Sequence, residues 1–221
     1  MKIENTEVYG FRPAFRGMRN PMDSWEDSDS EFLVGARVQP PLWDESQTCL
    51  EQPLLGAKDL ALAVKLVKQG GDHRKFLRMI CVWCDFVLPR YVWQEVDTYK
   101  VGTVRNSCST MNTLGKRQLV QGDFEGGLPE VFLDELNLAV SEFQSAETAL
   151  EKKGLRVELK GLLPEGFLQR ATYLLNYEVG LRMFFSRRNH RLPMWKEGVP
   201  GSICEWIRSW PYMKQFLDAA L

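Results

Sequence analysis

A short stretch in the middle of the chain combines cations, hydroxyls and a thiol around a glycine. Residues 97–116, DTYKVGTVRNSCSTMNTLGK, follow a run of bulky apolar side chains and place Lys100 and Arg105 on either side of Gly102. Backbone N–H groups and hydroxyls in such a loop can wrap an anion, and nearby cations supply charge. Two hypotheses follow: a cradle for phosphate or another anion, or a polar turn bonded only to itself. The GxxxxGK[ST] pattern of a P-loop is absent.

Two other segments could also face a negative ligand. His73 is followed by two basic residues, and SRRNHR at residues 186–191 includes Arg187 and His190. Asn176 precedes Arg187 by eleven positions, so both side chains can project from one face of a continuous helix. The alternatives are a surface or capping histidine, and a basic helix end that is favoured by the helix dipole.

Composition excludes several classes of protein. The 221 residues carry a net charge of −1, so no basic excess attracts duplex nucleic acid. No apolar run approaches the length of a membrane span. Five cysteines without an N-terminal signal segment are typical of a reducing compartment. We therefore expect a soluble, cytoplasmic protein that binds neither duplex nucleic acid nor membrane.

Motifs for metal binding and for familiar catalytic chemistry are missing. Cys81 and Cys84 form a CxxC among apolar neighbours, but no second CxxC or histidine pair completes a zinc site. The pattern predicts two buried core thiols and no metal. HExxH, GxSxG and GxGxxG do not occur, so the catalytic residues stay unknown.

Apolar periodicity and turn residues predict mixed elements in a single domain of residues 1–221. We expect helices over 57–69, 129–153, 176–188 and 202–209, and strands over 2–12, 78–87, 156–164 and 168–175. Prolines predict a long irregular segment at 13–56, which is typical of a functional or partner-facing loop. Because strands and helices do not alternate regularly, the fold class is α+β.

The tryptophans are expected to have structural roles. Trp83 and Trp93 lie in apolar runs and are predicted to be core residues. Trp195, Trp206 and Trp210 are predicted to pack the C-terminal end onto the body of the protein or onto a partner subunit.

The stretch from His73 to Lys100, HRKFLRMICVWCDFVLPRYVWQEVDTYK, resembles the core of the flavin-dependent thymidylate synthases. In that family a histidine and a phenylalanine open an apolar strand, which leads through a glutamine to an Arg-His-Arg triplet. A loop with an asparagine and a serine follows. The downstream stretch NYEVGLRMFFSRRNHR resembles the family's helix, with Asn176, Arg187 eleven residues later, and His190 nearby.

The chain departs from the family at the triplet and in the loop. Thr-Tyr-Lys at residues 98–100 stands in place of Arg-His-Arg, and Glu95 stands in place of the glutamine. The loop serine corresponds to Cys108 in strict register, or to Ser109 if one residue is inserted. Lys100 can replace a positive charge but not the planar fork of a guanidinium.

The resemblance implies a nucleotide site and a flavin site that share a cleft, on an α+β fold with a mixed or antiparallel sheet flanked by helices. The residues implied for the nucleotide are Glu95, Lys100, Arg105, Ser107, Ser109 and Arg187. The residues implied for FAD are His73, Thr98, Tyr99, Asn106, Asn176 and His190. Family members assemble as tetramers with sites shared between chains, so a homo-oligomer is expected.

Two functions are compatible with this resemblance. One is a nucleotide-binding enzyme that modifies a pyrimidine nucleotide by flavin and folate chemistry. The other is a non-catalytic protein that sequesters or senses a nucleotide and has lost the flavin site. A third alternative is an interaction protein that uses the 13–56 segment and the C-terminal tryptophans.

Overall fold

The structure is a computed structural model that describes residues 1–34 and 51–221, with side chains described for 1–33 and 53–221. Its internal contacts divide the chain into two compact units. The small unit contains Met1, Phe86–Thr98 and Asn106–Ala171, and the large unit contains Lys2–Asp85, Tyr99–Arg105 and Thr172–Leu221. Some strands of the central sheet have residues in both units. A single domain of residues 1–221 therefore stays a prediction.

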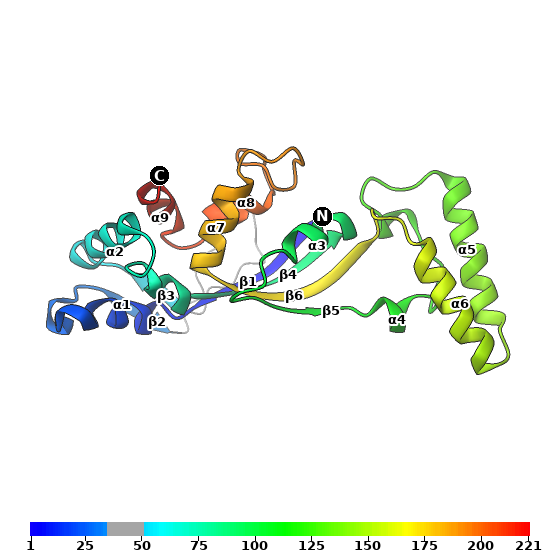
Figure 1. Ribbon diagram of the computed structural model, residues 1–221, viewed down its shortest axis with the longest axis horizontal. Helices are drawn as coiled ribbons and strands as arrows, with labels where there is room; N and C mark the ends of the chain where they lie inside the picture. The colour runs from blue at the N-terminus through cyan, green and yellow to red at the C-terminus, as the bar shows by residue number, and fades with distance from the viewer. Residues whose placement is uncertain (35–50) are drawn as a thin grey trace. The chain divides into compact units, whose positions relative to one another are not determined.

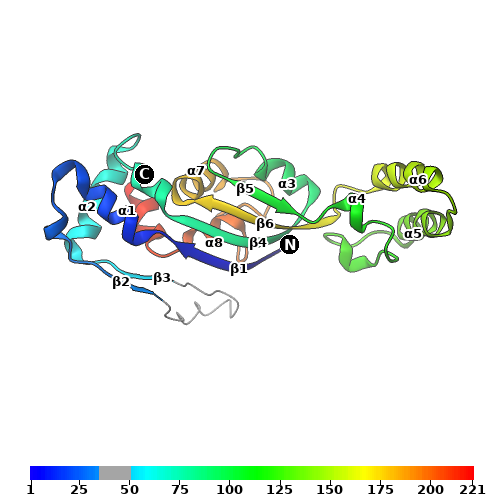
Figure 2. The ribbon, with the colours of Figure 1, turned by 90° about the horizontal axis from the view of Figure 1, so that it is seen from below.

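A four-stranded antiparallel sheet is the central element. Its order is β1 (Lys2–Tyr9), β4 (Cys81–Pro89), β6 (Leu168–Asn176) and β5 (Val104–Ser107), and the strands lie side by side in Figure 2. A two-stranded antiparallel sheet pairs β2 (Glu31–Val34) with β3 (Glu51–Leu54). The predicted α+β class and the strands predicted over 78–87 and 168–175 are confirmed.

Each unit also contains helices, which Figure 1 labels. The large unit contains α1 (Phe11–Arg19), α2 (Ala57–Gln69), α7 (Tyr177–Arg187), α8 (Ile203–Arg208), α9 (Met213–Ala219) and the 3₁₀ turns η1 (Asn20–Met22), η2 (Trp25–Asp27) and η3 (Lys75–Met79). The small unit contains α3 (Arg90–Val96), α4 (Thr110–Thr113), α5 (Glu130–Ser145), α6 (Ala149–Leu162) and the 3₁₀ turn η4 (Gln121–Asp123). The predicted helices over 57–69, 176–188 and 202–209 are confirmed.

Strand β4 alternates between a buried face and a more open face. Val82, Cys84, Phe86 and Leu88 are buried, whereas Cys81 is half-buried on the other face. Burial raises the pKa of both thiols. The prediction of two core thiols is therefore correct for Cys84 and wrong for Cys81, because a period of two separates positions i and i+3 onto opposite faces.

Aromatic side chains form much of the large unit's core. The ring of Tyr177 lies 5.4 Å from Phe11 and 5.2 Å from Trp210, centroid to centroid. A Cβ at Gly180 would come within 2.3 Å of the Trp210 ring, so only glycine lets α7 approach that ring. The indole of Trp206 donates a hydrogen bond to the Thr6 hydroxyl at 2.9 Å. The C-terminal tryptophans thus pack onto the body of the large unit, as one predicted alternative had it.

The prediction that residues 13–56 are irregular is wrong for much of the part that the structure describes, which contains α1, β2 and β3. Helix α1 buries Phe11, Ala14, Phe15 and Met18, a helical spacing that outweighs the proline at position 13. The C-terminal end of α1 is tied to α2 by a buried ion pair, in which Arg19 Nε lies 2.6 Å from an Asp59 carboxylate oxygen. Residues 35–50 of the predicted segment lie outside the described residues.

The region between residues 129 and 164 also differs from the prediction. The predicted helix over 129–153 is two helices, α5 and α6, and the predicted strand over 156–164 is the second half of α6. The backbone N–H of Glu151 donates to the Thr148 hydroxyl at 3.2 Å, and the Glu151 carboxylate accepts from the Thr148 N–H at 3.0 Å. This capping box starts a new helix at Ala149 and carries it through Gly154.

A candidate functional site around Arg187

Arg187 lies at the end of α7 and faces aromatic rings from two other segments. Its Nε donates to the Tyr99 hydroxyl at 3.2 Å, and its guanidinium carbon lies 5.8 Å from the centre of the Tyr99 ring. The same carbon lies 5.3 Å from the centre of the Trp195 ring, within cation–π range. We call Tyr99, Arg187, His190 and Trp195 the Arg187 cluster. It holds a guanidinium in a fixed orientation without any carboxylate among these four residues.

The N-terminal end of α7 is fixed by Asn176. Its side-chain oxygen accepts from the Val179 N–H at 3.0 Å, which caps the helix as the sequence predicts. Its amide nitrogen faces Gly102, where a Cβ would come within 2.7 Å. Gly102 has φ of +80°, so glycine permits both the left-handed turn and the close approach. The turn that contains Gly102 therefore lies against the start of the helix that carries Arg187.

The turn from Tyr99 to Arg105 also has internal bonds. The Tyr99 carbonyl accepts from the Thr103 hydroxyl at 2.5 Å and from the Tyr173 hydroxyl at 3.5 Å. These contacts fix the backbone on which the Tyr99 ring is carried, and the ring in turn contacts Arg187. The segment thus combines features of both hypotheses drawn from the sequence: it is a self-bonded turn, and it contacts the guanidinium that could meet an anion.

Hydrogen-bond donors outnumber acceptors among the groups of the Arg187 cluster. His190 Nδ1 accepts from the Leu192 N–H at 3.2 Å, and His190 Nε2 lies 3.2 Å from Arg187 Nη1. A neutral imidazole accepts at only one of its nitrogens. The indole N–H of Trp195 is fully buried and has no acceptor among the described residues. Buried polar groups nearly always have a partner, so a ligand or water with acceptor atoms suits this position.

The remaining predicted residues are divided between the two units. In the large unit His73 and Lys100 are exposed and Arg105 is half-buried, and His73 is not part of the Arg187 cluster. The small unit contains Glu95, Thr98, Asn106, Ser107 and Ser109. The Thr98 hydroxyl donates to the Glu95 carbonyl at 2.7 Å, so this predicted flavin contact already has a partner within its own turn. Convergence of these residues on one site stays a prediction.

The sequence analysis missed the role of Trp195 in this cluster. It predicted structural packing for Trp195, which is indeed fully buried, but not its contact with Arg187. The only signal available was position: Trp195 follows the basic 186–191 segment after a proline, so the chain can turn back there.

No group of three histidine, cysteine or acidic side chains within residues 1–34 and 51–221 is arranged to hold a metal ion. Among the same residues, no helix combines the length and the apolar character needed to cross a membrane.

Comparisons with known proteins give a likeness in structure and none in sequence. No family model matches the chain, and no curated protein is similar enough in sequence to match it. The fold matches a crystal structure of the flavin-dependent thymidylate synthase ThyX from Helicobacter pylori complexed with FAD and dUMP, with a TM-score of 0.63 and 15% identity over 98% of this chain and 97% of that chain. A second structure of that enzyme with FAD and dUMP gives the same TM-score and identity over 100% and 99% of the two chains.

The fold of this chain is therefore that of the flavin-dependent thymidylate synthases, matched over nearly the whole length of both chains. The resemblance inferred from the two sequence blocks is confirmed at the level of fold. At this identity the likeness establishes the arrangement of helices and strands and leaves the ligands of this chain to be inferred from its own residues.

Proposed function

We propose that this protein binds a pyrimidine nucleotide, with the Arg187 cluster as the anchor of the site. The observation that carries the proposal is the contact of Arg187 with Tyr99 and Trp195. Tyr99 belongs to the segment that the family resemblance assigns to ligand binding, and Arg187 is the guanidinium that it assigns to the nucleotide. The two blocks of resemblance thus meet in the large unit.

The chemistry of the cluster suits a ligand that is rich in acceptors. A pyrimidine nucleotide presents carbonyl oxygens and a phosphate, and a guanidinium forms charge-assisted hydrogen bonds to either. The buried Trp195 N–H is a further donor. Lys100 and Arg105, which lie in the neighbouring turn, are proposed to supply charge to the phosphate. The two similar crystal structures contain dUMP, which makes dUMP the first nucleotide to test.

The residues proposed for FAD fit that cofactor poorly. The family's Arg-His-Arg triplet is Thr-Tyr-Lys here, so two guanidiniums are absent from the chain. The Tyr99 hydroxyl already accepts from Arg187, and the Asn176 oxygen caps α7. We therefore derive no catalytic step through a flavin. These observations favour the second candidate function, a protein that sequesters or senses a nucleotide without turnover.

The assembly and the cellular location belong to the same proposal. A homo-oligomer, a tetramer by family resemblance, and a cytoplasmic location are inferred. Light scattering of the purified protein measures the oligomeric state directly, with and without dUMP.

The first experiment identifies the ligand. Small molecules released from the heat-denatured protein are analysed by mass spectrometry, and FAD is added separately to the purified protein. A pyrimidine nucleotide that is recovered intact, without flavin absorbance, supports the non-catalytic function. Flavin absorbance together with a chemically altered nucleotide supports the enzyme.

The second experiment tests the anchor. Titration calorimetry with dUMP compares the wild type with Arg187→Gln and with the control Arg182→Gln, which changes an exposed arginine on the same helix. Loss of a charge-assisted hydrogen bond of about 1.5–3 kcal/mol weakens binding roughly 10- to 100-fold at Arg187. The control is expected to bind like the wild type. Equal affinities for all three proteins would overturn the proposal.

A further inference from the structure

The helices α5 and α6 of the small unit each have a buried face and an exposed face. They lie side by side in Figure 1 and Figure 2. Leu133, Leu136 and Val140 of α5 are buried in one hydrophobic cluster with Leu159 of α6. The faces opposite these residues are exposed, yet each carries apolar side chains at a regular spacing.

The exposed face of α5 repeats one apolar and one acidic residue every seven positions. Val131 and Leu138 are 61% and 63% exposed. Glu135 and Glu142 each follow one of them by four positions and are exposed as well. Positions i, i+4, i+7 and i+11 lie on one side of a helix, so these four side chains form one stripe. We call it the acidic stripe.

The exposed face of α6 has the same repeat with the opposite charge. Leu150 and Val157 are 80% and 63% exposed and are again seven positions apart. Lys153 and Lys160 each follow one of them by three positions and are exposed. These four side chains lie on the side of α6 opposite the buried Leu159. We call them the basic stripe.

The charges of the two stripes have no partner of their own. None of these four charged side chains forms an ion pair or a hydrogen bond with another residue of the described chain. A stripe of one sign repels a copy of itself and complements a stripe of the other sign. Because both stripes lie opposite the cluster that their helices share, the two stripes of one chain cannot meet each other. A second copy of the chain can supply both complements.

Two glycines leave room for a neighbouring helix on α6. Gly154 and Gly161 lie four residues after Leu150 and Val157, on the same side of the helix. A Cβ at either glycine would meet no atom within 4 Å. Glycine weakens a helix interior, but the absence of a side chain lets another backbone approach closely.

We propose that the acidic stripe of one copy packs on the basic stripe of a second copy, with the two helices parallel. Seven residues of a helix rise about 10.5 Å, so the two stripes have the same axial repeat. With Val131 level with Leu150 of the second copy, Leu138 is level with its Val157. Apolar side chains therefore meet in two successive layers, as in a short coiled coil.

The same register pairs the charges. Glu135 then lies about 1.5 Å along the axis from Lys153 of the second copy, and Glu142 lies equally close to its Lys160. Side chains of this length easily span that offset. A two-fold axis forms the whole contact twice, since each copy offers both stripes. The inference rests on the homo-oligomer proposed above and adds the surface through which two copies associate.

The test reverses the charge of one stripe at a time in the full chain, and light scattering measures the mass. Glu135→Lys with Glu142→Lys makes both stripes basic, and Lys153→Glu with Lys160→Glu makes both acidic. Each variant alone is expected to associate at least tenfold more weakly than the wild type and to form a smaller assembly, because like charges then face each other. An equimolar mixture of the two variants is expected to recover the wild-type mass, because opposite charges meet again.

The controls are Lys152→Glu and Glu158→Lys, which reverse exposed charges of α6 outside the stripe and are expected to keep the wild-type mass. Melting temperatures establish that each variant is folded. A monomeric wild type overturns the proposed oligomer together with this interface. An oligomeric wild type overturns the interface alone if both variants keep its mass, or if their mixture stays dissociated. Variants that keep the wild-type mass but melt at a lower temperature would show that the stripes are covered within their own chain.

Discussion

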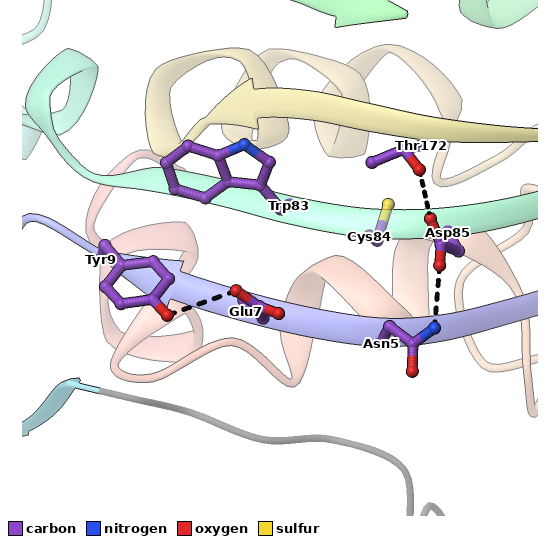
Figure 3. A pocket seen from close by; sticks show the side chains of 7 residues that line it. All are labelled: Asn5, Glu7, Tyr9, Trp83, Cys84, Asp85 and Thr172. Carbon is purple, nitrogen blue, oxygen red and sulfur yellow. Dashed lines mark hydrogen bonds between the residues drawn. The ribbon is translucent and has the colours of Figure 1, made fainter. Parts of the chain in front are cut away.

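Two regions of the large unit place charged side chains against aromatic rings, but with opposite sign. One is the Arg187 cluster, and the other is a cavity on the central sheet lined by Glu7, Tyr9, Trp83 and Asp85, among others, which we call the Trp83 cavity (Figure 3). In the Arg187 cluster the protein supplies the cation, which lies over Tyr99 and Trp195. In the Trp83 cavity the protein supplies carboxylates, and the rings of Tyr9 and Trp83 stand beside them. Aromatic content alone therefore does not specify a ligand's charge. The charged groups beside the rings differ between the two regions, and burial decides whether a ring also supports the fold.

The largest expected difference between the two regions concerns stability. Trp195 is fully buried, whereas Trp83 is half-buried at a cavity wall. Trp195→Ala is expected to lower the free energy of unfolding by about 3–5 kcal/mol, the usual cost of removing a buried large ring. Trp83→Ala is expected to cost about 1 kcal/mol, because less surface is buried there. Urea denaturation measures both values, and equal costs would contradict the distinction between a core ring and a wall ring.

A smaller effect is expected from the close approach between Gly102 and Asn176. Gly102→Ala places a methyl group within 2.7 Å of the Asn176 amide, in a residue with φ of +80°. The free energy of unfolding is expected to fall by about 2 kcal/mol through overpacking and backbone strain.

The control for this variant is Gly198→Ala, where φ is +79° and no atom lies within 4 Å of the added carbon. It is expected to show the backbone part alone, about 1 kcal/mol. Thermal denaturation compares the two. If Gly198→Ala is as destabilising as Gly102→Ala, the contact with α7 contributes nothing.

Asn176 tests whether a residue implied for the cofactor acts through the fold. Asn176→Ala is expected to cost about 1 kcal/mol of unfolding free energy, because the cap of α7 is lost. Asn176→Asp keeps a capping oxygen and is expected to be nearly neutral in stability. It adds a negative charge beside Gly102, however, so dUMP is expected to bind severalfold more weakly than to the wild type. Unchanged affinity in Asn176→Asp would place the nucleotide away from the start of α7.

The smallest effect near neutral pH is expected from Cys204, whose thiol reports on the environment of the Arg187 cluster. Burial is the main reason why the pKa of Cys204 rises from 9.0 to about 12, and the charge of Arg187 lowers it only partly. A thiol whose pKa is raised in the folded state stabilises fully below the unfolded value. This stability is then lost as pH rises from about 9 toward 12. Cys204→Ala is therefore expected to make the unfolding free energy less dependent on pH in this window, measured as the difference from the wild type. Parallel pH profiles would show that the thiol is not buried in solution.

The sequence predicted elements whose signals are local. Asn176 and Ser202 are good caps, and each cap marks the start of the helix that it was expected to start. The aromatic and β-branched residues of β4 are an equally local signal, and they predicted a strand there. The prediction missed that Trp83 and Cys81 lie on the face of the strand that is turned away from the core.

Elements that depend on distant partners were predicted less well. The end of α1 is held by the ion pair of Arg19 with Asp59, forty residues away, and Arg19 also donates to the Ser24 carbonyl of the region that follows. No local pattern reveals the partner in α2. The second half of α6 was taken for a strand because Gly154 was expected to end the preceding helix, whereas α6 continues through Gly154 to Leu162. In the candidate site, the family resemblance implied ligand contacts for Arg187 and Tyr99, and their binding of a ligand stays a prediction. Their contact, and the contact with Trp195, required the turn of the chain between α7 and α8.

The opposite orientations of Cys81 and Cys84 on β4 have a practical consequence for handling this protein. Sulfurs on opposite faces of a paired strand cannot reach disulfide geometry, so the folded molecule is expected not to form that crosslink in air. Only a chain whose strand has come apart can close the ring. Loss of the two free thiols, counted by alkylation and mass spectrometry, would then report how many molecules in a sample have opened.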